Sequence, residues 1–353
     1  MIPVLDGHND TLLRLYLTGE AATRHFLMGD PAGHLDLPRA RAGGLAGGFF
    51  AVYVPPEPPD VVLDGSDLTL TDTGYAVRLA PPLDTGYAQR VALAVSAGLF
   101  RLARASAGQV RVVRTAAELA ACLAAGTLAA ILHFEGAEAL DPAGDALEVW
   151  YAAGLRSLGL VWSRPNAFGH GVPFQYPRTP DTGPGLTAAG KALVRHCNQL
   201  GVLIDLSHLN EQGFWDVAAL SAAPLVATHA NAHTLCPSTR NLTDRQLDAI
   251  RASDGMVGLN FSVCDLRADG YNEADTPLTT LVAHIDYLVA RLGIDRVGFG
   301  SDFDGTLIPT EMGDVRGLPK LIQALRDHGY DADALRKLAH ANWLRVLSQT
   351  WRA

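Results

Sequence analysis

The stretch VLDGHNDT, residues 4–11, places Asp6, His8 and Asp10 at alternate positions directly after a hydrophobic start. Residues two apart in a β-strand share a face, so these three side chains would point the same way. Imidazole and carboxylate groups are the usual ligands of divalent metals, and Asp6, deeper in the strand, would support the other two. A surface turn is the alternative, because Gly, Asn and Asp all favour turns.

Residues of the same kind end other short apolar runs of the chain. These residues are Glu135, His208, His229 and Asp302. If the runs are parallel strands of one barrel, their C-terminal ends converge on the face where active sites lie. Three histidines and three carboxylates then meet, a set typical of zinc or a similar divalent metal. Each of these residues alone could instead be a helix cap, a turn former or a buried histidine. The occurrence of all of them at the same end of different strands favours a metal site.

Eight short apolar runs are predicted to be strands, at residues 3–8, 46–53, 129–135, 157–162, 202–208, 225–229, 256–261 and 296–302. Helical patterns occur between and after them, at 86–106, 115–125, 187–200, 243–253, 278–292 and 332–348. The second and fourth of these begin with capping boxes, Thr115 to Glu118 and Thr243 to Gln246. Strands that alternate with helices indicate a parallel sheet, and eight such units favour a (β/α)8 TIM barrel. A doubly wound open sheet is the alternative.

The whole chain, residues 1–353, is expected to form a single barrel domain with two long loop insertions. They lie at about 54–85, which contains PPEPP, and at 163–186, which contains five prolines. Long loops in a compact domain are usually functional or disordered, and we expect both insertions near the mouth of the barrel.

Composition argues against several classes of protein. The net charge of −9 and the lack of any Lys/Arg-rich run disfavour nucleic-acid binding. The longest apolar runs are interrupted before they could span a bilayer. The four cysteines lack CxxC spacing, which indicates free thiols in a cytoplasmic protein and no structural zinc knuckle. The motif begins at residue 4 and leaves no room for a signal peptide, so we expect a cytoplasmic location.

The chain resembles the membrane (renal) dipeptidase family of amidohydrolase-like barrels with binuclear zinc sites. The blocks DGHNDT, HFEGAEAL, DLSH, THANAHTLCPSTRNLTD and VGFGSDFDG match that family in order and spacing over nearly the whole chain. The resemblance implies zinc-dependent hydrolysis of dipeptides, including those with a D-residue at the C-terminal position, and a homodimer. The membrane anchor of animal members is not expected here, because the chain ends in LSQTWRA.

The resemblance also implies how the ligands divide between two divalent metal ions, expected to be Zn²⁺. His8 and Asp10 would bind one ion, His208 and His229 the other, and Glu135 would bridge them. A hydroxide between the ions would attack the peptide carbonyl.

Two further roles follow from the same resemblance. Asp302 would be the acid–base carboxylate that takes the proton of the hydroxide and passes it to the leaving amine. Arg240 would bind the terminal carboxylate of the substrate with its planar fork of donors. The alternative for Arg240 is a surface arginine paired with Asp244.

One position departs from the family. A histidine that helps to bind substrate is expected 27 residues after the bridging glutamate, where Trp162 stands in this chain. An indole can donate one hydrogen bond but cannot titrate. His170 and His233 are candidates for a relocated substrate-binding group, each with an ordinary loop histidine as its alternative. The departure leaves open a related hydrolase of another amide or ester, or a metal-binding homologue with little turnover.

Overall fold

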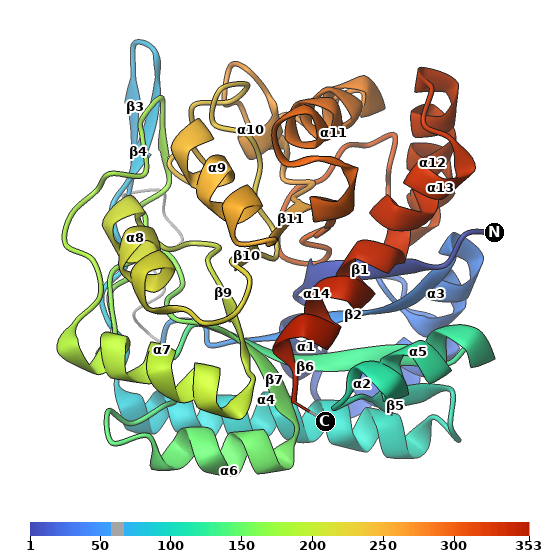
Figure 1. Ribbon diagram of the computed structural model, residues 1–353. Helices are drawn as coiled ribbons and strands as arrows, with labels where there is room; N and C mark the ends of the chain where they lie inside the picture. Colours follow the sequence, from blue (N-terminus) through green and yellow to red (C-terminus); the bar gives the residue numbers. More distant parts are fainter. Residues whose placement is uncertain (58–66, 353) are drawn as a thin grey trace.

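The computed structural model describes residues 1–57 and 67–352, in which parallel strands form a closed barrel surrounded by helices (Figure 1). The barrel strands are β1 (Val4–Asn9), β2 (Leu45–Tyr53), β6 (Leu128–Glu135), β7 (Leu155–Gly159), β9 (Leu203–Asp205), β10 (Val226–Ala227), β11 (Met256–Leu259) and β12 (Val297–Phe299). The last strand pairs with the first, with Asp6 opposite Phe299, and β2 pairs with β6. This closure confirms the predicted TIM barrel, and the open-sheet alternative is wrong. A short extra strand, β5 (Val110–Val112), pairs with the start of β6.

Several strands are shorter at their C-terminal ends than the apolar runs that predict them. Four of the predicted runs continue beyond the last residue of their strand. They are 157–162 at β7, 202–208 at β9, 225–229 at β10 and 296–302 at β12. The final residues of these runs, Trp162, His208, His229 and Asp302, therefore lie in the loops that leave the barrel. Strand β1 is irregular as well, because its register against β2 shifts at Val4/Leu5 and again at Asp6/Asn9. The side chains of β1 therefore do not simply alternate between the two faces of the sheet along the whole strand.

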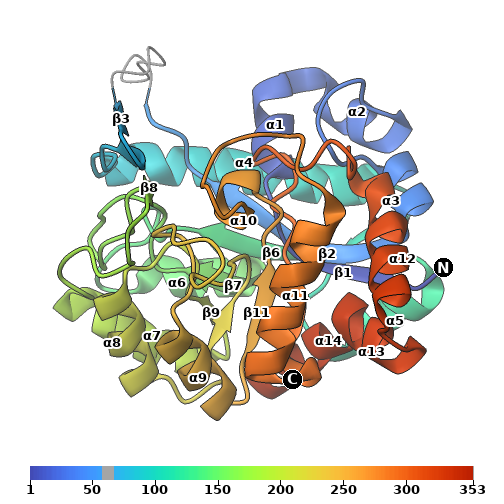
Figure 2. The same cartoon turned by 90° about the horizontal axis from the view of Figure 1, so that it is seen from above.

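Helices pack around the barrel, as the view from above shows (Figure 2). Their bounds are α1 (Thr11–Thr18), α2 (Ala22–Met28), α3 (Leu37–Gly43), α4 (Thr85–Ala105), α5 (Ala116–Ala125), α6 (Asp145–Ala153), α7 (Ala188–Leu200), α8 (Glu211–Leu220), α9 (Asp244–Ala252), α10 (Val263–Leu266), α11 (Leu278–Leu292), α12 (Leu318–His328), α13 (Ala332–Arg336) and α14 (Asn342–Thr350). The predicted helix 332–348 is split by a π-helical turn at Lys337–Ala341. Among the helices in the described ranges, none combines the length and the apolar character that crossing a membrane requires.

The two capping boxes differ in the structure. At the start of α9, Thr243 and Gln246 form the complete reciprocal pair. At the start of α5, Thr115 accepts a hydrogen bond from the backbone of Glu118, as predicted. The Glu118 carboxylate, however, accepts from the backbone N–H of Arg114, one residue earlier than a capping box requires. The second half of that prediction is therefore wrong.

The two long insertions contact each other beside the barrel. Residues 54–85 contain β3 (Leu68–Thr71) and β4 (Gly74–Val77), and residues 163–186 contain β8 (Gln175–Tyr176). These strands form a three-stranded antiparallel sheet in the order β3-β4-β8, at the upper left of Figure 2. The end of PPEPP lies outside the described residues. The division of the chain into domains stays a prediction.

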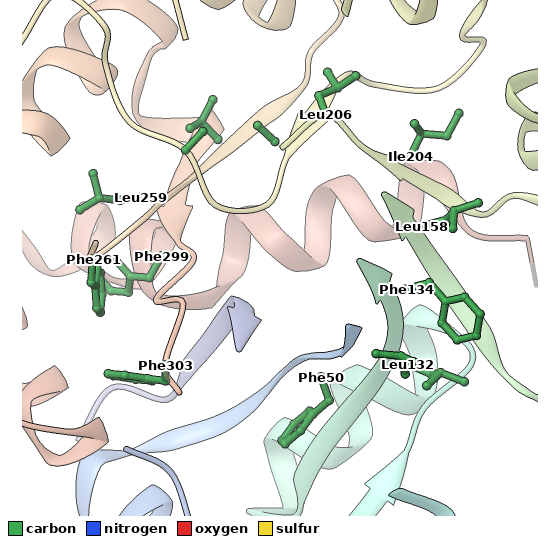
Figure 3. Packing of buried hydrophobic residues seen from close by; sticks show 14 of the residues in the cluster. Phe50, Leu132, Phe134, Leu158, Ile204, Leu206, Leu259, Phe261, Phe299 and Phe303 are labelled. Atoms are coloured by element: carbon green, nitrogen blue, oxygen red, sulfur yellow. The ribbon is translucent and has the colours of Figure 1, made fainter. Parts of the chain in front are cut away.

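Hydrophobic side chains form two layers, one between the barrel and the helices and one inside the barrel. Phe50, Leu132 and Phe134 belong to the outer layer, part of which is shown in Figure 3. Phe49 belongs to the inner layer, which is closed at the bottom by Trp343 of α14. The Trp343 indole is fully buried and donates a hydrogen bond to a strand carbonyl, that of Phe299, over 3.1 Å.

Strand glycines make room for this indole. A Cβ atom built at Gly7 would lie 2.5 Å from the Trp343 ring, and one at Gly298 would lie 2.9 Å from its nitrogen. Trp343 therefore closes the floor of the barrel, and the opposite end is left for polar residues.

We predict that Trp343→Ala lowers the free energy of unfolding by about 3–5 kcal/mol, because it leaves a cavity under the barrel. Urea unfolding of the purified protein measures this loss. Trp215→Ala is the control, since that indole lies half-buried on α8. Equal losses in the two variants would contradict the account of the barrel floor.

Candidate metal centre and substrate cavity

The barrel brings the predicted ligands to one end of its strands. His8 lies within β1, and Glu135 is the last residue of β6. His208 follows the end of β9 by three residues, His229 follows β10 by two, and Asp302 follows β12 by three. These positions come from distant parts of the chain, so their meeting depends on the closed barrel.

Glu135 lies at the centre of the cluster. Its Oε1 atom is 2.9 Å from Nε2 of His208 and 3.7 Å from the Nε2 atoms of both His8 and His229. All four side chains are buried. Three imidazoles, one from strand β1 and two from the loops that follow β9 and β10, therefore face one carboxylate oxygen.

Asp10 and Asp302 extend the cluster on the side of His8. Nε2 of His8 is 3.4 Å from a carboxylate oxygen of Asp10. Ligand atoms of His8, Asp10 and Asp302 all lie within 4.8 Å of one another, as do those of His8, Glu135 and His229. A third such group joins His8 to His133 and Asp205, so three possible ligand groups among the described residues share His8.

The hydrogen bonding of these residues fits a bound cation. Neither ring nitrogen of His8 has a hydrogen-bond partner, nor does the buried Oδ1 atom of Asp10. The Nε2 atoms of His208 and His229 face each other at 3.1 Å. Buried polar groups are normally satisfied, and divalent cations bound here would satisfy Nε2 of the three histidines and the carboxylate oxygen of Asp10. The residues present therefore suit a metal site.

Hydroxyl groups outside the cluster orient two of the imidazoles. Ser163 Oγ lies 2.8 Å from Nδ1 of His208, and Thr228 Oγ1 lies 2.9 Å from Nδ1 of His229. Thr228 also donates a hydrogen bond to Asp205 over 2.5 Å. Such outer contacts leave Nε2 of each ring free to bind a metal. Sequence reasoning missed these three supporting residues, although Thr228 directly precedes His229 and Asp205 belongs to the DLSH block.

Electrostatics differ among the histidines. Burial lowers the pKa of His208 and His229 well below the usual value, and the positive charges of Arg240 and His8 add to this effect. Both are therefore neutral, the form that binds metals. Burial also disfavours the charged form of His8, but the carboxylates of Glu135 and Asp10 outweigh it and raise the pKa of His8 to about 10. Metal binding there would release a proton.

Asp302 is held in an unusual backbone conformation. Its φ of +60° lies in the left-handed region, which non-glycine residues rarely adopt and which clusters at functional sites. The preceding residue is anchored by Asp6, whose carboxylate accepts hydrogen bonds from the backbone N–H and the hydroxyl of Ser301, at 2.7 and 2.8 Å. Asp6 thus supports the loop that carries Asp302.

The protonation of Asp302 suits proton transfer. Burial raises its pKa to about 7, the negative charge of Asp10 adds to the rise, and His8 and Asn260 act in the opposite direction. Asn260 donates a hydrogen bond to Oδ2 of Asp302 over 3.0 Å. A carboxyl group with a pKa near neutrality can both accept and deliver a proton.

A cavity of about 320 Å³ opens onto the cluster, with Arg240 and Trp162 in its lining. Arg240 is 6% exposed, and its Nη2 atom makes one long hydrogen bond of 3.3 Å, to the carbonyl of His229. Within the described ranges Arg240 forms no ion pair, and Asp244 pairs with Arg291 instead. The guanidinium is thus free to bind an anion in the cavity.

Trp162 lies in the aromatic part of the cavity lining. Its ring lies 5.1 Å from that of Tyr53, 5.5 Å from that of Phe174 and 5.8 Å from that of His208. His170 and His233 are not brought there. Their ring nitrogens face the carbonyls of Gly185 and Arg178 instead, at 3.2 and 3.1 Å.

Comparison with known proteins agrees with this geometry. The family model described as membrane dipeptidase (peptidase family M19) matches residues 1–353. A metallopeptidase from Rhodobacter sphaeroides, whose crystal structure holds a phosphinate mimic of the dipeptide L-Ala-D-Ala, is 53% identical, with a TM-score of 0.95 over 99% of each chain. A crystal structure of a dipeptidase of family M19 is also 53% identical, with a TM-score of 0.94 over 100% of this chain and 99% of the other.

A more distant relative has lower sequence identity to this chain but is also a dipeptidase. Dipeptidase tcpJ of Claviceps purpurea is 28% identical over 351 residues, which are 98% of this chain and 76% of that protein. Because the family model matches its entire length, the chain belongs to the membrane dipeptidase family, peptidase family M19.

Proposed function

We propose that this protein hydrolyses dipeptides with two divalent metal ions, expected to be Zn²⁺. The observation that carries the proposal is the convergence of three imidazole Nε2 atoms on one oxygen of Glu135, next to the unpaired guanidinium of Arg240. The bound L-Ala-D-Ala mimic in the related Rhodobacter structure supports dipeptides with a D-residue at the C-terminal position as substrates.

In this proposal the ligands divide as the family resemblance implies. His8 and Asp10 would hold one ion, His208 and His229 would hold the other, and Glu135 would be a ligand for both. Two bound ions would supply a water molecule with a lowered pKa and would polarise the substrate carbonyl. The chain itself keeps His208 and His229 neutral and aims their Nε2 atoms at Glu135 through Ser163 and Thr228.

Asp302 is the proposed acid–base group. It accepts a proton as the attacking water adds to the carbonyl and gives that proton to the departing amine. Its left-handed backbone and the Asn260 amide, which donates to Oδ2, keep the carboxylate at the edge of the ligand cluster.

Arg240 is the proposed anchor for the free C-terminal carboxylate of the substrate. The planar guanidinium offers two parallel donors to a carboxylate. Because Arg240 lies in the same cavity of about 320 Å³ as Glu135 and Asp302, a dipeptide can place its carboxylate on Arg240 and its peptide carbonyl at the ligand cluster. The small volume favours dipeptides over longer chains.

Trp162 supports a competing function, hydrolysis of an amide or ester other than a dipeptide. Its indole replaces the family's substrate-binding histidine and cannot titrate, which would suit a related hydrolase of a non-dipeptide amide or ester. A metal-binding homologue with little turnover has less support, because Asp302 and its hydrogen bond to Asn260 are present. The homodimer and the cytoplasmic location stay expectations, and light scattering of the purified protein would test the dimer.

We predict that Asp302→Asn lowers kcat for L-Ala-D-Ala by about 10²–10⁴-fold, since the amide cannot carry a proton between water and leaving amine. Steady-state kinetics measure this loss, and elemental analysis of the same sample measures the metal. Retained metal with lost turnover fits an acid–base role. Loss of the metal would mean that Asp302 is mainly a ligand.

We further predict that Arg240→Ala raises KM for L-Ala-D-Ala far more than for the same dipeptide with an amidated C-terminus. The reason is that only the free carboxylate can use the guanidinium fork. His233→Ala serves as the control, because the His233 ring bonds the Arg178 carbonyl outside the cavity. Equal increases for both substrates would refute the assignment of Arg240.

A further inference from the structure

Arg164 is a fully buried arginine behind the aromatic part of the cavity lining, and neither the metal site nor the proposed chemistry uses it. Its Nε atom donates to Oε1 of Glu138 over 2.9 Å, and its Nη2 atom donates to the carbonyl of Val54 over 2.6 Å. Its guanidinium carbon lies 5.1 Å from the ring centroid of Tyr53 and 4.9 Å from that of Trp162. These distances fall within the range of cation–π attraction.

The contacts of Arg164 join three loops at the mouth of the barrel. Val54 directly follows β2 and begins the first long insertion, and Glu138 follows the end of β6 by three residues. Arg164 itself lies in the second insertion, after β7. Tyr53 is paired with Glu135 in the β2–β6 register, so the tyrosine against which the guanidinium lies is the strand neighbour of the central carboxylate of the cluster.

Stability alone does not account for this ion pair. Burying two opposite charges usually adds little compared with apolar side chains of the same size. One nitrogen of Arg164 and one oxygen of Glu138 also lack hydrogen-bond partners. Lysine could neutralise Glu138 as a point charge, but only the planar fork can bond Glu138 and Val54 and lie against two rings at once.

We propose that Arg164 is a positioning residue that fixes Trp162 and Tyr53 as one rigid wall of the substrate cavity. Through this wall it controls how tightly the dipeptide binds, whereas the metal site and Asp302 carry out the cleavage. The inference rests on the proposed dipeptidase function. It assigns to Trp162 a role in substrate packing, at the position where the family has a substrate-binding histidine.

The test is a double-mutant cycle between Arg164→Lys and Trp162→Leu, with L-Ala-D-Ala as substrate. Turnover by the unmodified protein tests the dipeptidase function itself, and the comparison among the variants tests Arg164. We expect Arg164→Lys to raise KM at least fivefold, to change kcat less than threefold and to leave the metal content unchanged. In the Trp162→Leu background the same change should alter KM less than twofold, because residues that act through one contact are not additive.

Arg156→Lys is the matched control. Arg156 is also buried and lies against a tyrosine ring, at 4.1 Å from that of Tyr151, but its hydrogen bonds go to carbonyls outside the cavity. Arg156→Lys should lower the free energy of unfolding without changing KM for L-Ala-D-Ala. If Arg164→Lys does not fold, Arg164→Met combined with Glu138→Gln removes both charges and is measured in the same way.

Two results would overturn the proposal. The first is a folded, metal-loaded Arg164 variant whose KM matches that of the unmodified protein. The second is an equal rise of KM in the presence and absence of the Trp162 indole, which would show that Arg164 does not act through the wall.

Discussion

One oxygen atom of Glu135 faces Nε2 of His8, His208 and His229, and most of the structure can be understood as the means of holding these four groups together. A buried carboxylate and three buried imidazoles are unfavourable in an apolar interior unless something satisfies them. The unpartnered nitrogens of His8 show that the protein alone does not do so. Divalent cations would resolve this conflict, which makes metal binding the condition on which the arrangement depends.

One end of the barrel stabilises the fold, and the other end carries the candidate site. At the floor, glycines in the strands let the Trp343 indole close the interior with apolar contacts. At the mouth, the strands stop early and short loops carry polar groups inward, two of them with positive φ at His208 and Asp302. Strain at the mouth is tolerable because the floor and the outer hydrophobic layer stabilise the frame.

Much of the fold could be predicted from sequence, as could which residues meet at the mouth of the barrel, because both depend on local patterns. Which of these residues bind metal stays a prediction. Apolar runs marked every barrel strand, and Glu135 and His229 stood at the ends of such runs. What could not be predicted depends on contacts between distant segments. The pairing of β4 with β8 and the contact of Ser163 with His208 each join segments that lie far apart in the chain. The contact of His170 with the Gly185 carbonyl depends on how the second insertion folds back on itself. The π-helical turn before α14 likewise interrupts a pattern that reads as one continuous helix.

Elemental analysis of the purified protein and of Glu135→Gln after dialysis shows directly whether the cluster around Glu135 binds metal. An amide at this position keeps the size of the side chain but removes the charge that the three imidazoles face. We expect two equivalents of divalent metal per chain in the unmodified protein, a clear loss in the variant and a parallel loss of dipeptide hydrolysis. Full metal occupancy in Glu135→Gln, or dipeptide hydrolysis by metal-free protein, would contradict this expectation.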